Sequence, residues 1–166
     1  MNNETISQDL INKFSEDKIF GITENYGLLN ITTTPDNIIP MMHYLYQHPV
    51  FKFQFLTDLA GIHFPDVPNH EFGVIYHLHS LENNVRLIVK TYISKENPEL
   101  PTLTGLYAAA NWMEREAFDF YGIIFKGHPK LERILNAEEM DYHPMRREYP
   151  LEDATRMDKI DDLFGR

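Results

Sequence analysis

The amino-acid sequence predicts an α+β protein: a two-layer domain with a largely antiparallel mixed sheet and helices, followed by an extended C-terminal arm. Three observations lead to this fold class. The chain has 166 residues, which is the size of one domain. Helical and strand-like patterns alternate as far as Tyr121, as they do in two-layer α+β proteins. Beyond Tyr121 no periodicity is sustained, so we divide the chain into a compact domain, 1–121, and an arm, 122–166.

The elements of the compact domain follow from the spacing of apolar residues and from residues that start or stop helices. Ile6 and Leu10 recur at helical spacing. Pro35 follows a capping hydroxyl, as at the start of a helix, and Pro49 ends that helix because the residue before proline avoids the helical region. Runs rich in aromatic and β-branched residues indicate strands. The expected elements are helices over 4–17, 34–47 and 103–121 and strands over 18–23, 28–33, 51–61, 72–81 and 85–93.

The last of these helices carries a charge within its apolar stripe. At about 100° per residue, Glu114 lies near the centre of the stripe that also holds Leu103, Ala110 and Ala117. A buried carboxylate is costly unless it is paired or strongly hydrogen-bonded. We therefore expect Arg133 of the arm to pair with Glu114. In the alternative, Glu114 lies at the solvated edge of the sheet.

The opposite face of the same helix holds Trp112, Arg115 and Asp119. A tryptophan beside an arginine on an outer face is typical of binding hot spots. The pattern therefore predicts a partner-binding surface on this side of the helix. The alternative is that the arm itself covers Trp112.

The composition excludes several classes of protein. The chain has no cysteine, which excludes disulfides, thiolate catalysis and cysteine-ligated iron–sulfur clusters within it. Its net charge of −10 disfavours binding to nucleic acid or to an anionic membrane surface. No stretch reaches the roughly 18 apolar residues of a transmembrane helix, and the polar N-terminus lacks the pattern of a secretory signal. We expect a cytoplasmic protein.

The histidines offer one candidate for chemistry. His77 and His79 are two residues apart in an expected strand, so they share a face, and Asp66 or Glu71 would complete a metal site. An autonomous metal-dependent hydrolase is therefore an alternative function, although paired histidines on a solvated sheet face are the commoner arrangement. The motifs of zinc proteases, P-loop proteins, dinucleotide-binding proteins and serine hydrolases are absent from the sequence.

The arm is too apolar for a segment that lies only in solvent. Its apolar residues include Ile123, Phe125, Leu131, Ile134 and Leu135. So long a segment without regular structure is unusual inside a compact domain. It is either disordered or ordered by another protein, and its composition favours an extended arm lying on a partner. A free-standing adaptor that binds other targets through this arm is a further alternative.

Two motifs resemble a known family. The first runs Glu114-Arg115-Glu116, then Asp119, then Gly127-His128-Pro129 with a basic, aliphatic ending, and the second is His143-Pro144-Met145-Arg146-Arg147-Glu148-Tyr149-Pro150-Leu151. Together they resemble the 30 kDa (C-type) subunit family of the proton-translocating NADH–quinone oxidoreductase, respiratory complex I, over residues 114–151. The chain departs from the family pattern at Glu132, where a basic residue is common, and at Tyr142, where glycine is common.

The resemblance implies a cofactor-free structural subunit in the hydrophilic part of the complex. Its chief partner would be the D-type subunit, which forms much of the quinone cavity, with the cluster-bearing B-type and I-type subunits nearby. Iron–sulfur clusters and quinone would belong to those partners, and the assembled enzyme would couple electron transfer to proton translocation. The implied location is the cytoplasmic side of the cell inner membrane, reached through the complex. The equivalent subunit of a membrane-bound hydrogenase or an F420-type dehydrogenase is the alternative.

The resemblance also assigns structural roles in partner binding to individual residues. Charged and hydrogen-bonding groups would end the helix, glycines would allow tight turns, His-Pro pairs would fix extended corners, and arginines would pair with carboxylates or carbonyl groups. Together with Trp112, the residues are Glu114, Arg115, Glu116, Asp119, Gly122, Gly127, His128, Pro129, Arg133, His143, Pro144, Arg146 and Arg147.

Overall fold

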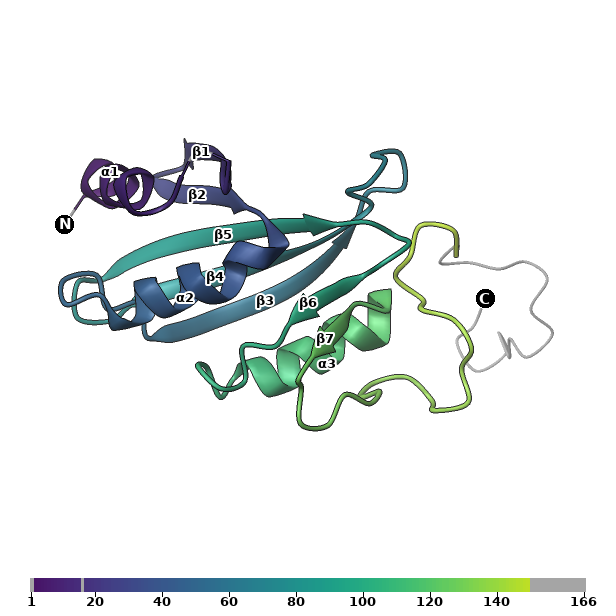
Figure 1. The fold of residues 1–166 in the computed structure, drawn as a ribbon. Coiled ribbons are helices and arrows are strands. Elements are labelled where there is room, and N and C mark those ends of the chain that lie inside the picture. Colours follow the sequence, from purple (N-terminus) through teal and green to yellow (C-terminus); the bar gives the residue numbers. More distant parts are fainter. Residues whose placement is uncertain (1, 16, 150–166) are drawn as a thin grey trace, which may run out of the picture.

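The computed structural model describes residues 2–15 and 17–149, and their helices and strands form an α+β fold (Figure 1). The last part of the predicted arm, 150–166, lies outside the described residues. The elements in chain order are α1 (Asn3–Lys13), β1 (Ile19–Asn25), β2 (Leu28–Thr33), the 3-10 turn η1 (Pro35–Asn37), α2 (Ile38–Gln47), β3 (Phe55–His63), β4 (Phe72–Ser80), β5 (Val85–Ile93), β6 (Glu99–Pro101), α3 (Ala110–Tyr121) and β7 (Ile124–Lys126).

Five strands form one mixed sheet in the order β1-β2-β5-β4-β3. The neighbours β1 and β2 are antiparallel, as are β3 with β4 and β4 with β5. The β1–β2 hairpin joins the antiparallel strands β3, β4 and β5 through β2, which runs parallel to β5. In this pairing Leu29 lies opposite Leu87 and Ile31 lies opposite Val89. The prediction of an α+β domain with a largely antiparallel mixed sheet is confirmed.

One face of the sheet forms the hydrophobic core. Side chains alternate between the two faces of a strand, and on β4 the residues Val74, Tyr76 and Leu78 are buried while Ile75 and His77 are only half-buried. Figure 1 shows α2 across the front of the sheet, and α3 contacts the same face at the edge strand β3, where Gly61 is paired with Val74 and lies against Tyr121. The domain therefore consists of a helical layer on one face of a sheet.

The approach of α3 to the sheet depends on a glycine in the edge strand β3. Gly61 faces α3, and a Cβ atom at this position would lie 2.5 Å from Cδ2 of Tyr121. Because atoms cannot approach so closely, only glycine lets the last turn of α3 lie on β3 without displacing the tyrosine ring. This contact fixes the end of α3, from which the arm continues.

Two predictions of local structure are corrected. The helix predicted over 103–121 begins at Ala110, because the preceding residues form a separate turn in which the carbonyl oxygen of Leu103 accepts the N–H groups of Leu106 and Tyr107. The arm, where the sequence indicates no strand, contains β7, which pairs in parallel with β6. Both strands are three residues long, too short for a periodic pattern. Within the described part of the chain, no helix combines the length and hydropathy that crossing a bilayer requires.

Candidate partner-binding site on α3 and the arm

The arm turns back along α3 directly after the helix ends. Gly122 caps α3 in the left-handed conformation, with φ 76°, and its N–H donates to the carbonyl oxygen of Phe118. A Cβ atom at this position would collide with the side chains of Arg146 and His143. A second turn follows at Gly127, where φ is 83°. Both glycines therefore have backbone conformations that other residues rarely adopt.

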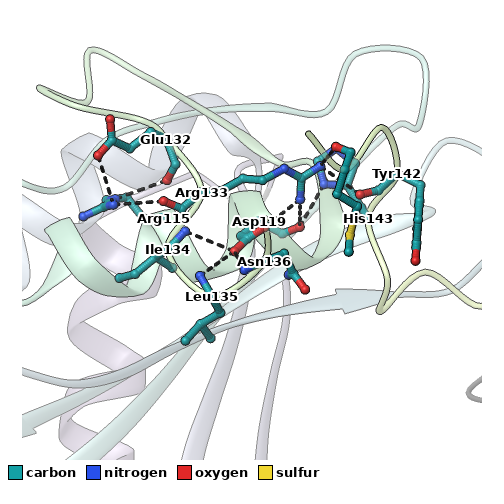
Figure 2. Close-up of polar contacts among 10 residues, drawn as sticks. Arg115, Asp119, Glu132, Arg133, Ile134, Leu135, Asn136, Tyr142 and His143 are labelled. Carbon is teal, nitrogen blue, oxygen red and sulfur yellow. Dashed lines mark hydrogen bonds and ion pairs between the residues drawn. The ribbon is translucent and has the colours of Figure 1, made fainter. Parts of the chain in front are cut away.

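Asp119 is fully buried and anchors the arm through four donors (Figure 2). Its Oδ2 atom accepts the backbone N–H groups of Ile134 at 3.1 Å, Leu135 at 2.8 Å and Asn136 at 2.9 Å. Its Oδ1 atom pairs with Nη1 of Arg133 at 2.6 Å. Burial alone would raise the pKa of this carboxyl, but the three N–H groups and the guanidinium hold the pKa well below its usual range. Asp119 is therefore a charged anchor at neutral pH.

Arg133 connects this anchor to the next stretch of the arm. Its Nη2 atom donates to the carbonyl oxygens of Met140 at 2.7 Å and Tyr142 at 2.8 Å, while Nη1 holds Asp119. Nδ1 of His143 donates to the main-chain oxygen of Asp119 at 2.9 Å. The planar, five-donor guanidinium suits such a junction, which a lysine could not reproduce. A loop without secondary structure is thus ordered by its own chain.

Glu114 is the second buried carboxyl of α3, and its environment differs. Its Oε2 atom accepts the hydroxyl of Thr102 at 2.5 Å, and its Oε1 atom accepts the N–H of Leu103 at 2.7 Å. It forms no ion pair with any described residue, and burial raises its pKa to about 7 against the opposing effect of these two donors. Glu114 therefore holds the segment that precedes α3.

These contacts correct two predictions. Arg133 pairs with Asp119 and not with Glu114. Asp119, on the side of the helix opposite the apolar stripe, is buried as well. Helical spacing separates the two faces of α3 correctly, but it does not indicate that the arm covers part of the outer face. The alternative location of Glu114, at a solvated edge, is also wrong because its side chain is fully buried.

Trp112 and Arg115 lie side by side on the outer face of α3. The guanidinium carbon of Arg115 is 5.2 Å from the centre of the Trp112 ring, and the side chain of Trp112 is 61% exposed. Arg115 also donates to the carbonyl oxygens of Glu132 at 3.2 Å and Arg133 at 3.0 Å. The described part of the arm, 122–149, therefore binds Arg115 and leaves Trp112 accessible.

The first His-Pro pair fastens the turn after β7. Nε2 of His128 donates to the carbonyl oxygen of Asn111 at 3.0 Å, and Nδ1 accepts the N–H of Lys130 at 3.0 Å. This pattern fits a neutral imidazole that carries its proton on Nε2. The neighbouring Pro129 is exposed, as is Glu116 on α3.

The second motif docks on the end of α3 and on the sheet. Nε of Arg146 donates to the carbonyl oxygen of Tyr121 at 2.7 Å, and its guanidinium lies 4.9 Å from the ring centre of Phe72. The backbone N–H of Arg147 donates to Nδ1 of the buried His63 at 3.1 Å, while Arg147 as a whole is exposed. Pro144, between these contacts and His143, is half-buried.

Sequence analysis missed three residues that complete these contacts. Thr102 and Leu103 bind Glu114, and His63 binds the arm from a position 84 residues away in the chain. No local pattern marks them, because each acts through a partner brought close by the fold. Helical spacing identified only the outer-face neighbours Trp112, which is exposed, and Arg115, which the arm binds.

The metal site considered for His77 and His79 does not form. The carboxylate of Glu71 accepts the backbone N–H groups of Asn69 at 3.1 Å and Lys95 at 2.9 Å, so it braces a loop. Within residues 2–15 and 17–149, no three histidine, aspartate or glutamate side chains are grouped so that they could hold a metal ion.

Comparison with known proteins gives the family. The sequence model of the respiratory-chain NADH dehydrogenase 30 kDa subunit matches residues 31–155, and the chain belongs to this family. The C-type subunit of the NADH-quinone oxidoreductase of Roseiflexus sp. (strain RS-1) is 42% identical over 137 residues, which cover 81% of this chain and 77% of that protein. The resemblance inferred from the two motifs is thereby confirmed.

Two solved structures share the fold. A trypsin-resistant fragment of Nqo5 is 31% identical, with a TM-score of 0.67, and the match covers 79% of this chain and 100% of that one. A chain of an archaeal membrane-bound sulfane sulfur reductase has a TM-score of 0.73 at 24% identity, covering 89% of this chain and 85% of its own length. The second likeness concerns the fold alone.

Proposed function

We propose that this chain is a structural subunit, without a cofactor of its own, of the hydrophilic part of an NADH-quinone oxidoreductase. The family match over residues 31–155 carries this proposal. In the assembled complex the chain supports electron transfer to quinone and the coupled translocation of protons, while iron–sulfur clusters and quinone belong to its partners. Its chief partner is the quinone-cavity (D-type) subunit, with the cluster-bearing B-type and I-type subunits nearby, on the cytoplasmic side of the inner membrane.

The outer side of α3 and the arm is the proposed contact surface for these partners. Trp112 is 61% exposed, and along the arm Leu135 and Met145 are 65% and 48% exposed. Trp112 projects from α3 itself, while the N–H of Leu135 donates to Asp119 and the N–H of Met145 donates to the carbonyl oxygen of Phe120. A preorganised surface binds more tightly because little chain entropy is lost on binding. The bound arm therefore keeps the conformation that it has in the free chain.

A pull-down from native membranes tests the proposal. The full chain carries a tag at Met1, the membranes are solubilised in a gentle detergent, and mass spectrometry identifies the proteins recovered. We expect the quinone-cavity subunit and the two cluster-bearing subunits. A chain recovered alone, from a preparation in which the complex demonstrably survives, would contradict the proposal.

Two substitutions of exposed aromatic residues locate the surface in the same experiment. Trp112→Ala should lower recovery of the partner subunits at least tenfold, because truncating a buried interface aromatic typically costs about 2 kcal/mol or more. Tyr26→Ala removes a fully exposed ring in the β1–β2 turn and serves as the matched control. Equal recovery with both variants would remove Trp112 from the interface.

The same recovered proteins separate the alternatives. Subunits of a membrane-bound hydrogenase or an F420-type dehydrogenase in place of an NADH-oxidising module would assign the chain to a related complex. Metal analysis of the purified chain tests the hydrolase alternative, for which stoichiometric bound zinc is required. We expect no stoichiometric metal, because Glu71 is bound to backbone N–H groups.

A further inference from the structure

The sheet has a second face, opposite the one on which α2 and α3 lie. Its register aligns Ile75 with Lys90, His77 with Ile88, and His77 with Asp58 on the other side. His79 and Arg86 form the next pair along the same two strands. We call the surface formed by Asp58, Ile75, His77, Arg86, Ile88 and Lys90 the open face.

The open face has an apolar centre within a polar surface. Ile75 and Ile88 are diagonal neighbours on adjacent strands and are half-buried, whereas Val74 and Val89 on the core face are fully buried. A hollow of about 120 Å³, lined in part by Asp58, His77 and Ile88, adjoins this centre. An antiparallel sheet face left to water alternates apolar and polar residues, with the polar residues outward. Two isoleucines at the centre of this face instead fit a surface that another polypeptide covers.

The charge of the open face differs from that of the chain. The open face carries two positive charges, on Arg86 and Lys90, and one negative charge, on Asp58, although the net charge of the chain is −10. Neither Arg86 nor Lys90 lies within ion-pairing distance of a carboxylate among the described residues. By contrast, Lys52, Lys126 and Lys130 each pair with a glutamate. An unpaired positive surface on an acidic protein is complementary to an acidic partner.

We propose that the open face binds an acidic surface of a neighbouring subunit of the same complex. Ile75 and Ile88 form the apolar centre of this contact, Arg86 and Lys90 pair with carboxylates of the partner, and the hollow beside Asp58 receives one partner side chain. His77 and His79, which the sequence suggests as metal ligands, then belong to an interface. The inference rests on the proposed function and places a second interface on the side of the domain opposite α3.

The absence of cysteine from the sequence allows a direct test in the assembled complex. In Ile88→Cys the new thiol is unique in this chain, and a benzophenone maleimide attached to it forms cross-links only with groups in contact. The matched control is Tyr26→Cys, on the exposed β1–β2 turn. We expect Ile88→Cys, and not Tyr26→Cys, to cross-link to another subunit within a peptide rich in aspartate or glutamate.

Charge reversal tests the role of the two cations. Arg86→Glu combined with Lys90→Glu should lower the yield of this cross-link at least tenfold. The control combines Lys13→Glu with Lys18→Glu, two cations outside the open face, and should leave the yield unchanged. The urea midpoints of all four purified variants should match those of their parent chains, which separates a lost contact from a lost fold.

The outcomes distinguish this inference from the proposed function. If the tagged chain recovers the quinone-cavity and cluster-bearing subunits but Ile88→Cys forms no cross-link, or forms one only to a second copy of this chain, the inference is wrong and the proposed function stands. A cross-link that persists unchanged in the charge-reversed variant would also overturn it. If the tagged chain recovers no other protein of the complex, both the inference about the open face and the proposed function are wrong.

Discussion

The helix α3 buries two carboxyl groups, and their surroundings shift the two pKa values in opposite directions. Asp119 receives Arg133 and three backbone N–H groups, and its pKa lies well below the usual range. Glu114 receives one hydroxyl and one N–H, with no cation among the described residues, and its pKa rises to about 7. Both side chains are fully buried, so burial by itself does not decide their charge.

The difference lies in the number and kind of donors. Four donors, one of them charged, compensate the ionised carboxylate of Asp119 for the water that it has lost. Two neutral donors do not compensate Glu114 fully. One carboxyl is therefore a permanent ionic anchor for the arm, and the other is a group whose charge changes near neutral pH. Four substitutions test this contrast and the contacts around it.

The largest loss of folding stability is expected from Asp119→Ala. It leaves three N–H groups without an acceptor and Arg133 without its counter-ion, which costs about 3–5 kcal/mol for a buried pair. Urea denaturation followed by circular dichroism measures the loss, and cleavage by trypsin within the arm should become faster. The matched control, Asp141→Ala, removes an exposed carboxyl from the same arm. Equal midpoints for the two variants would refute the anchoring role.

The next effect is the pH dependence that Glu114 imposes. Because its pKa is about 7 in the folded chain and near 4.5 when unfolded, the folded state holds the proton more strongly between these values. Stability therefore falls as pH rises from about 4.5 to 7, by at most about 3 kcal/mol. Glu114→Gln keeps an acceptor for Leu103 and should remove this fall.

The measurement compares wild type and Glu114→Gln by urea denaturation at pH 5 and pH 8. We expect the variant to be the more stable protein at pH 8, with a smaller difference at pH 5. The control is Glu116→Gln, an exposed glutamate two residues away on the same helix, which should parallel wild type. A constant difference between wild type and Glu114→Gln across this range would show that Glu114 is ionised throughout.

A smaller loss is expected from Gly122→Ala. The left-handed φ of 76° costs a residue with a side chain about 1–2 kcal/mol, and the new methyl group would displace Arg146 and His143. Gly105→Ala is the matched control, because a Cβ atom there meets nothing within 4 Å. Thermal unfolding should show a lower Tm for the first variant alone. A similar Tm for both would mean that the arm tolerates movement at this turn.

The smallest effect is expected at Glu132, where the family commonly has a basic residue. Its carboxylate pairs with Arg115 at 3.3 Å and Lys130 at 3.0 Å near the surface, and such pairs contribute about 0–1 kcal/mol. Glu132→Gln should therefore change the urea midpoint little, since Arg115 keeps its bonds to two carbonyl oxygens. A loss comparable to that of Asp119→Ala would show that the Glu132 carboxylate is essential to the arm.

Sequence reasoning predicted the parts of the fold that local patterns encode. Strands pair as hairpins where alternating runs flank turns, so the β4–β5 pair was predictable from residues 72–93. The parallel pairing of β2 with β5 was not, because nothing within Leu28–Thr33 indicates which distant strand it meets. The strands β6 and β7 are too short to show a period.

The candidate site on α3 and the arm was likewise predictable only where a local pattern encodes it. Helical spacing identified Glu114 as a buried charge that needs compensation, and Trp112 as an exposed aromatic residue. It could not identify the partner of Glu114, because Thr102 and Leu103 reach it only through a turn that replaces the predicted start of the helix. It placed Asp119 on the face opposite the apolar stripe but could not indicate that this side chain is buried, because a helical wheel shows one apolar face and the arm covers part of the other.

The parallel seam between β2 and β5 also has a consequence for biosynthesis. The β1–β2 hairpin leaves the ribosome early, but the edge of β2 that faces β5 stays unpaired until the β3–β4–β5 meander has been made. Such non-local pairing slows folding, and an open strand edge is a template for mispairing while it lasts. The nascent chain is therefore most vulnerable to aggregation between the synthesis of β2 and that of β5.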